Sequence, residues 1–124
     1  MTTESETDHL NEIGAEIMGW KRIERDKYYP DDDLDYWGSE KEYYYSIKDW
    51  SPATDLNHTD MVEQEMVGKR WHIQIIFGLN HDDRWEVVLN NSTINYNLYL
   101  GYAPINQKAL AVMRAIDKAW EGGK

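Results

Sequence analysis

The sequence has no cysteine, three prolines and a single phenylalanine among its 124 residues. A chain without cysteine has no disulfide framework and no thiolate ligands for a structural zinc ion. No apolar run approaches the roughly 20 residues of a membrane-spanning helix. The first eight residues, MTTESETD, lack the basic start and the apolar stretch of a signal peptide. We therefore expect a cytoplasmic protein that does not bind a membrane.

Positive charge is also scarce. Lys and Arg together number 13 against 23 Asp and Glu, which gives a formal net charge of -10 at pH 7. A chain of this charge repels the DNA phosphates, so we expect no binding to duplex nucleic acid. Strong acidity commonly keeps a protein soluble, and it also suits docking to a basic protein or mimicry of nucleic acid.

Aromatic residues, in contrast, are abundant. The chain has six Trp and nine Tyr, and half of all its aromatic side chains lie between Lys27 and Trp50. The length is that of one domain with a single core. We expect one domain over residues 1–124, a disordered N-terminus at residues 1–8 and an aromatic-acidic insert at residues 24–42.

Hydrophobic periodicity predicts the main elements. Apolar residues alternate with polar ones over residues 71–77, 84–90 and 95–102, which predicts three antiparallel strands. A fourth, short strand is predicted at residues 43–47.

Three helices are predicted as well. The first carries Leu10, Ile13 and Ile17 on one face and ends at Gly19. The second is capped by Thr54 or Asp55 and ends at Gly68, and the third starts at Pro104 and runs to Trp120.

Helices that flank an antiparallel sheet define the α+β class. Apolar residues on both sides of the predicted strands, such as Ile76, Val88 and Tyr99, indicate a sheet that is at least partly covered on both faces.

Four segments in this order resemble the phage ABA sandwich domain, a small domain of bacteriophage and prophage proteins. They are "IMGW" (residues 17–20), "SPATDLNHTDMVEQEM" (residues 51–66), "WHIQI…WEVVL" (residues 71–89) and "GYAPINQKALAVMRAI" (residues 101–116). The insert is longer than the corresponding loop of that family. The resemblance implies a phage origin and an α/β/α sandwich with an antiparallel sheet of three to five strands and three helices. It implies no catalytic residues, and the matched Gly19, Trp20, Thr54, Asp55 and Trp71 are interpreted as helix stops, caps and core anchors.

The insert contains part of the acidic pattern of a calcium-binding loop. Asp31, Asp33, Asp35 and Glu42 occupy the first, third, fifth and twelfth positions of an EF-hand, but the sixth position, which requires glycine, is Tyr36. The histidines have no helical spacing of metal ligands. We therefore expect a solvated acidic loop, no metal site and no cofactor.

Catalytic patterns are not found either. The serines have no elbow or triad context, and no glycine-rich phosphate loop is present. The carboxylates are numerous, but their number alone is no evidence for acid–base chemistry. We expect a protein that is not an enzyme.

The few cations are clustered near aromatic residues. Lys21 and Arg22 precede the insert, Arg25 lies at its start, and Arg70 starts a predicted strand. If the insert folds over that edge of the sheet, cations and rings meet, as a nucleotide ligand requires. The alternative is that the rings form core and the cations only balance neighbouring acids. The candidate ligand-binding residues are Lys21, Arg22, Arg25, Trp37, Tyr43, Tyr45 and Arg70.

Three functional hypotheses follow. The first is a non-enzymatic phage protein that counteracts host defence in the host bacterial cytoplasm. As a homo-oligomer it would sequester a nucleotide-derived immune signal, of the cyclic nucleotide or cyclic ADP-ribose type. The second is an acidic inhibitor or nucleic-acid mimic that binds a basic host protein, and the third is an enzyme acting on nucleotides.

Overall fold

The computed structural model describes residues 4–23, 36–39, 43–78 and 84–123. Its elements are α1 (Glu4–Ile17), β1 (Lys21–Ile23), β2 (Tyr36–Gly38), β3 (Tyr43–Ser46), α2 (Leu56–Gly68), β4 (His72–Gly78), β5 (Arg84–Asn90), β6 (Tyr99–Pro104) and α3 (Lys108–Gly122). The strands form two antiparallel sheets, a small sheet in the order β1-β2-β3 and a large sheet in the order β4-β5-β6.

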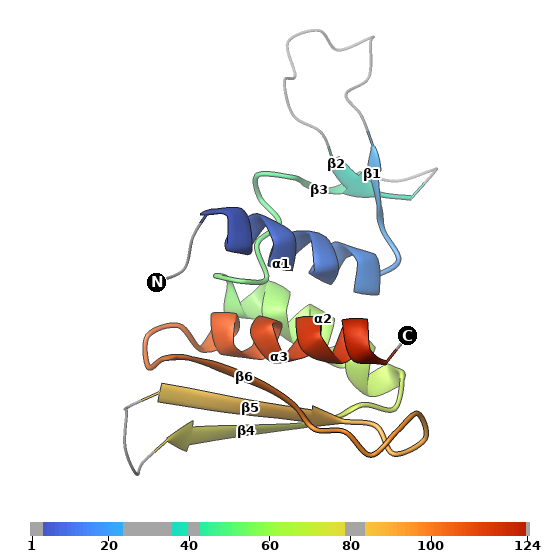
Figure 1. The fold of residues 1–124 in the computed structure, drawn as a ribbon. Helices are drawn as coiled ribbons and strands as arrows, with labels where there is room; N and C mark the ends of the chain where they lie inside the picture. The colour runs from blue at the N-terminus through green and yellow to red at the C-terminus, as the bar shows by residue number, and fades with distance from the viewer. Residues whose placement is uncertain (1–3, 24–35, 40–42, 79–83, 124) are drawn as a thin grey trace, which may run out of the picture.

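The elements are stacked in layers, and the α+β class with three helices and antiparallel strands is confirmed. Figure 1 shows the small sheet above α1, then α2 and α3, and the large sheet below α3, so that the helices occupy the middle of the sandwich. The apolar stripe of α3 explains its central place. Its alanines and its larger apolar residues are buried against the large sheet on one side and the other helices on the other.

The N-terminal helix starts earlier than predicted. Residues 4–8 form the first turns of α1, so the expected disorder of residues 1–8 is wrong for this part. The physical reason is an ion pair that the sequence does not reveal. Arg114 of α3 donates from Nε and Nη2 to the two carboxylate oxygens of Glu6, at 3.0 and 2.7 Å, and from Nη1 to the Tyr102 carbonyl. These bonds from Arg114 also lower the pKa of Glu6.

The third predicted strand of the meander is shifted along the chain. Tyr96 and Leu98 were expected on its core-facing side, but they precede β6 and are exposed. The side of β6 that faces α3 carries Gly101 and Ala103, which are buried opposite Val87 and Trp85 of β5. Small residues are needed here because α3 lies directly against this strand.

The start of α3 also differs from the prediction. Pro104 is the last residue of β6 and not the first residue of the helix. A turn follows, in which the Gln107 amide donates to the Pro104 carbonyl at 2.9 Å, and the helix begins at Lys108.

Three of the described rings of the aromatic stretch, Trp37, Tyr45 and Trp50, lie in or against the core. Trp50 is fully buried, and its Nε1 donates to the Asn11 carbonyl of α1 at 2.9 Å. Its ring lies 4.7 Å from that of Trp20 and 4.9 Å from that of His58, between centroids, and Tyr45 contacts the same rings. Tyr44 stacks on Trp20 at 5.1 Å from the outside. We call Trp20, Tyr44, Tyr45, Trp50 and His58 the aromatic cluster, and it joins the small sheet to α1 and α2.

Candidate functional site

Most of the predicted ligand-binding residues lie on the small sheet. Lys21 and Arg22 are on β1, Trp37 is on β2, and Tyr43 and Tyr45 are on β3. Arg22 pairs with Trp37, and Trp37 pairs with Tyr45, so that these three form one row across the strands. The strand register therefore places one cation and two aromatic residues at neighbouring positions of the small sheet.

The two rings of this row, however, point into the molecule. Trp37 is buried in the hydrophobic core, and Tyr45 packs against that core as part of the aromatic cluster. The Tyr45 hydroxyl lies 3.8 Å from the Met61 sulfur of α2. This packing favours the alternative interpretation, in which the rings serve as core.

Arg70 does not belong to this group. It lies in the connection between α2 and β4, with φ of 72°, and so adjoins the large sheet and not the small one. Of the insert, residues 36–39 are described, and its strand β2 pairs with β1 and β3 in a separate sheet on the other side of the helices from the meander (Figure 1). The rest of the predicted insert lies outside the described residues.

Some predicted residues lie outside the described part of the chain. These are Arg25, the side chain of Tyr43, and the acidic positions Asp31, Asp33, Asp35 and Glu42. Among the described residues, no three His, Asp or Glu side chains gather in a way that would hold a metal ion. Within the same ranges, no helix has the length and apolar character needed to cross a membrane.

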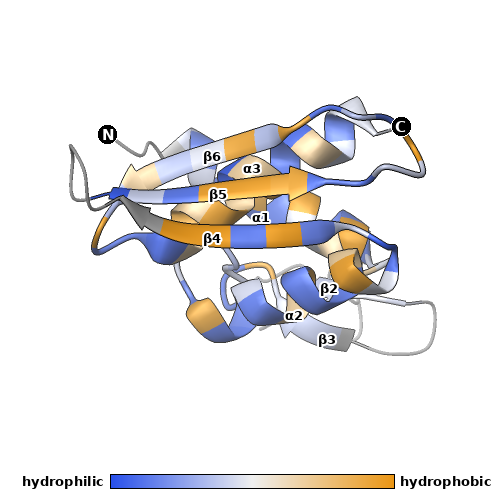
Figure 2. Ribbon diagram, turned by 90° about the horizontal axis from the view of Figure 1, so that it is seen from below, coloured by the Kyte–Doolittle hydropathy of each residue, from blue (hydrophilic) through white to orange (hydrophobic). Residues whose placement is uncertain are grey.

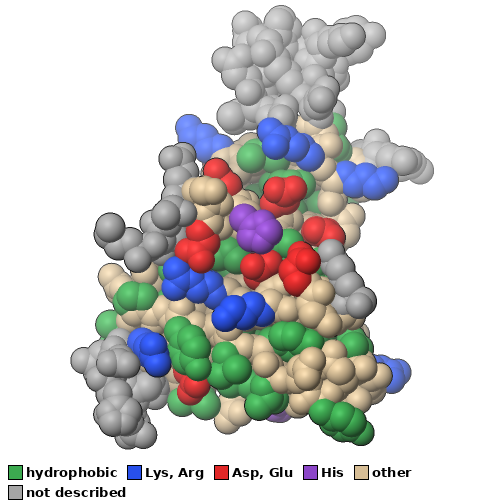
Figure 3. Space-filling model, in the orientation of Figure 1, with side chains coloured by type: hydrophobic (Ala, Val, Ile, Leu, Met, Phe, Trp, Pro, Cys, Tyr) green, Lys and Arg blue, Asp and Glu red, His purple; other side chains and the backbone are tan. Residues whose placement is uncertain are grey.

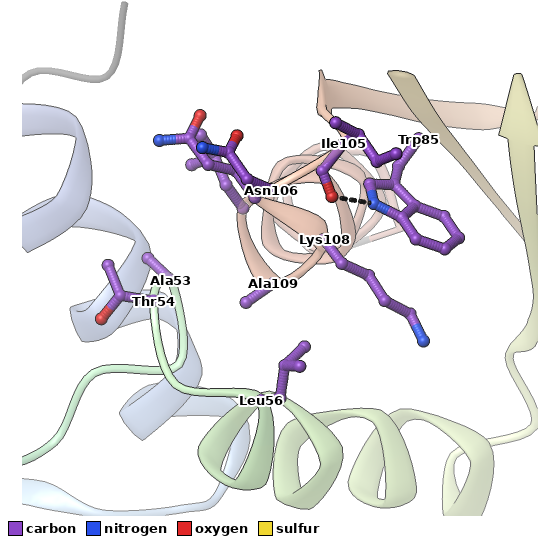
Figure 4. Close-up of a pocket in the computed structure, with 10 residues that line it drawn as sticks. Ala53, Thr54, Leu56, Trp85, Ile105, Asn106, Lys108 and Ala109 are labelled. Carbon is purple, nitrogen blue, oxygen red and sulfur yellow. Dashed lines mark hydrogen bonds between the residues drawn. The ribbon is translucent and has the colours of Figure 1, made fainter. Parts of the chain in front are cut away.

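A pocket of about 500 Å³ lies where the first turns of α2 and α3 approach the start of β5. We call it the Trp85 pocket (Figure 4). The residues that line it are Ala53, Thr54, Leu56, Trp85, Ile105, Asn106, Gln107, Lys108, Ala109 and Leu110.

One wall of this pocket pairs a cation with an aromatic ring. Trp85 points to the helix side of the large sheet, as Val87 and Leu89 do, but lies beyond the first turn of α3 and stays half-buried. Its Nε1 donates to the Ile105 carbonyl at 2.7 Å, which fixes the indole. The Lys108 Nζ lies 5.3 Å from the centroid of the ring, within the range of a cation–π contact.

The two helix ends at the pocket differ in charge. At α2 the Asp55 carboxylate accepts hydrogen bonds from the backbone amides of Asn57 and His58. These first-turn amides therefore have an acceptor, and a negative charge already lies at this helix end. At α3 the N-cap residue Gln107 makes no side-chain capping bond, and the first turn holds no acid. First-turn amides of a helix lack intrahelical acceptors and carry partial positive charge. The α3 side therefore attracts an anion, and Leu56 supplies an apolar surface across the gap in Figure 4.

The charge of Lys108 also affects the pKa of a carboxyl group on α2, that of Glu63. Burial raises the pKa of Glu63, the Asp60 carboxylate raises it further, and Lys108 opposes the rise. An ionised Glu63 therefore weakens the native state at neutral pH, because its carboxylate loses more hydration than it regains from its neighbours.

We expect the substitution Glu63→Gln to raise the melting temperature at pH 7 and to leave it unchanged at pH 4. The pKa of Glu63 is raised in the folded state above its ordinary value of 4.5. The protonated carboxyl therefore contributes fully to the stability of the fold below pH 4.5, and this contribution is lost as the pH rises through the folded-state pKa. Glutamine never ionises and keeps that contribution at both pH values. Circular dichroism melts at the two pH values measure the difference.

The matched control for this experiment is Glu65→Gln on the same helix. Glu65 is half-exposed, and its carboxylate lies 3.5 Å from the Lys69 ammonium group. An exposed ion pair of this kind contributes little to the free energy of unfolding. A melting temperature that falls at pH 7 in Glu63→Gln would contradict the assignment.

The Trp85 pocket was not predicted from the sequence. From local periodicity, Trp85 is one of the alternating apolar residues of a predicted strand and Lys108 lies off the apolar stripe of the predicted third helix. No local signal links them, because their contact depends on where α3 starts relative to β5.

Comparison with family models, with characterised proteins and with solved structures found no match for this chain. The resemblance to the phage ABA sandwich domain stays a prediction.

Proposed function

We propose that this chain is a non-enzymatic binding protein that holds an anionic, ring-bearing small molecule of the nucleotide class in the Trp85 pocket. The observation that carries the proposal is the Lys108 ammonium group 5.3 Å from the centroid of the Trp85 ring, in a pocket of about 500 Å³. Pockets of about 300–1,000 Å³ enclose small organic ligands.

The lining matches the two parts of such a ligand. A flat base lies against the exposed surface of the indole, between Leu56 and Ile105, and each stacked base contributes about 1–3 kcal/mol. The phosphate group faces Lys108 and the first turn of α3, because both carry positive charge. The side-chain amides of Asn106 and Gln107 supply donors and acceptors for polar edges of the ligand.

Sequestration fits this lining better than turnover. Among the described residues that line the pocket there is no carboxylate, no histidine and no thiol, so general acid–base chemistry has only Lys108 to use. Together with the resemblance to phage proteins, this supports a homo-oligomeric sponge that removes a nucleotide-derived immune signal in the host bacterial cytoplasm.

A thermal-shift screen against mononucleotides, cyclic nucleotides and cyclic ADP-ribose tests the proposal. A ligand at a hundredfold excess over its dissociation constant stabilises the native state by about 2.7 kcal/mol. For a chain of this size we expect the melting temperature to rise by about 10 °C. Chromatography of the mixture should return the ligand unchanged.

The variant Lys108→Met, which keeps most of the apolar stem, should weaken that ligand at least about tenfold, the equivalent of about 1.4 kcal/mol. Lys118→Ala, an exposed lysine of the same helix outside the Trp85 pocket, is the matched control and should bind like the wild type. A panel without any shift, or an equal shift in Lys108→Met, would refute this site, and an altered ligand would indicate an enzyme.

The acidic surface supports a second candidate. Asp8, Glu12 and Glu16 are exposed on α1 at intervals of four residues, so they follow one side of the helix. Figure 3 shows acidic side chains gathered on the face that α1 shares with its neighbours. This surface suits docking to a basic host protein, whose affinity would fall steeply as salt rises.

A further inference from the structure

The large sheet has one face that no described element covers. On this face the side chains of β5 are Arg84, Glu86, Val88 and Asn90, since Val87 and Leu89 are buried on the opposite face against the helices. Their cross-strand partners are His72, Gln74, Ile76 and Gly78 on β4, and Leu100, Tyr102 and Pro104 on β6. In Figure 2 this face of the sheet is nearest the viewer, with the helices behind it. We call it the open face.

The strands β4 and β5 contain short apolar runs of the kind found in strands covered on both sides. A strand with one solvated face alternates apolar and polar residues, whereas consecutive apolar residues are typical of burial on both faces. Here Ile75-Ile76 and Val87-Val88-Leu89 are consecutive apolar residues. On the open face Val88 lies between Gln74 and Leu100, and Ile76 is 37% exposed. Leu98, just before β6, is 61% exposed.

The charges of the open face distinguish it from the rest of the molecule. Arg84 and Glu86 are of opposite sign and both contact Tyr102. The Arg84 guanidinium carbon is 4.4 Å from the ring centroid, and the Tyr102 hydroxyl donates to Glu86 at 3.2 Å. These two charges cancel, although the whole chain carries -10. A basic partner is attracted to the acidic surface on α1 instead. Two copies of this chain can meet at the open face without electrostatic repulsion between the two faces themselves.

We infer that a second copy of the chain packs its own open face on this one, as a two-fold symmetric dimer. Stacked sheets lie about 10 Å apart, with interleaved side chains. Two strands of seven residues and one of six cover about 24 Å by about 14 Å. Two such faces together measure about 670 Å², below the roughly 1,000 Å² of a stable interface, so the dimer should be weak and should dissociate on dilution.

This inference is independent of the proposed ligand. The Trp85 pocket lies on the helix side of the large sheet and the open face on the other, so either can fail without the other.

Sedimentation velocity over a concentration range of two decades, without ligand, tests the dimer. The wild type should shift from monomer to dimer as its concentration rises. Ile76→Lys places two added charges inside the interface and should raise the dissociation constant at least tenfold. The matched control is Val67→Lys, a 52% exposed valine on α2 and therefore outside the open face, and it should dimerise like the wild type.

Gln74→Lys serves as a second variant, because Gln74 is already polar and exposed and its replacement does not disturb the fold. It should also weaken the dimer at least tenfold, and this result supports the inference even if Ile76→Lys does not fold. A wild type that stays monomeric at every concentration would overturn the inference. So would a dimer that Gln74→Lys leaves intact.

Discussion

Replacing Gly101 by alanine is expected to lower the free energy of unfolding by about 3 kcal/mol or more, which for a domain of this size abolishes most of its stability. A Cβ atom at this position would collide with the Ala111 carbonyl oxygen and the Ala115 amide, and would lie 3.0 Å from the Ala115 Cα. All three are backbone atoms of α3, which cannot turn aside as a side chain can. The strand and the helix must separate, and the core between them opens. The midpoint of urea denaturation, followed by circular dichroism, measures the loss.

Gly68→Ala at the end of α2 is the control for Gly101→Ala. A Cβ atom at Gly68 meets nothing within 4 Å, and alanine favours a helix over glycine by about 1 kcal/mol. We expect Gly68→Ala to be as stable as the wild type or slightly more stable. An unchanged urea midpoint in Gly101→Ala would show that β6 does not lie this close to α3.

Trp50→Ala should be the second large effect, with a loss of about 3–5 kcal/mol in the free energy of unfolding. The Trp50 ring is fully buried, and its Nε1 donates to the Asn11 carbonyl at 2.9 Å. Removing it leaves a cavity among Trp20, Tyr45 and His58, and an unsatisfied carbonyl on α1. Urea denaturation measured by circular dichroism gives the value.

Tyr44→Ala is the matched control in the same cluster. Tyr44 is 44% exposed and stacks on Trp20 from the solvent side, so its removal leaves no enclosed cavity. We expect a loss of about 1 kcal/mol or less. Equal losses in both variants would contradict the assignment of Trp50 to the core and of Tyr44 to the surface.

The Trp50 and Tyr44 variants also bear on the structural role of the aromatic stretch. The many rings between Lys27 and Trp50 first indicated a ligand surface, but Trp37 and Trp50 are buried and Tyr45 packs against them. They anchor the small sheet to α1 and α2. Trp85, whose ring lines the Trp85 pocket, comes from a segment whose alternation predicted only a strand.

Several elements follow from the sequence alone. The Asp55 cap and the end of α2 at Gly68 were predicted and are confirmed, as are the β4 and β5 strands. Gly19, predicted to end the first helix, has φ of 81° and follows α1 directly, a conformation that glycine adopts without strain. The physical reason is that caps, glycine stops and apolar alternation act between residues a few positions apart.

Tertiary contacts decided the rest. The sequence did not show that α1 starts at Glu4, because its first turn is held by Arg114 from the far end of the chain. The face of β6 that packs inward, and the start of α3 after Gln107, depend on how closely Gly101 lets the strand approach the helix. The same packing separates Arg70 from the small sheet and places Lys108 beside Trp85. The sequence by itself therefore determined the class of the fold and most of its elements. Which faces meet, and so where a pocket and an open face lie, was decided by contacts between residues that are distant along the chain.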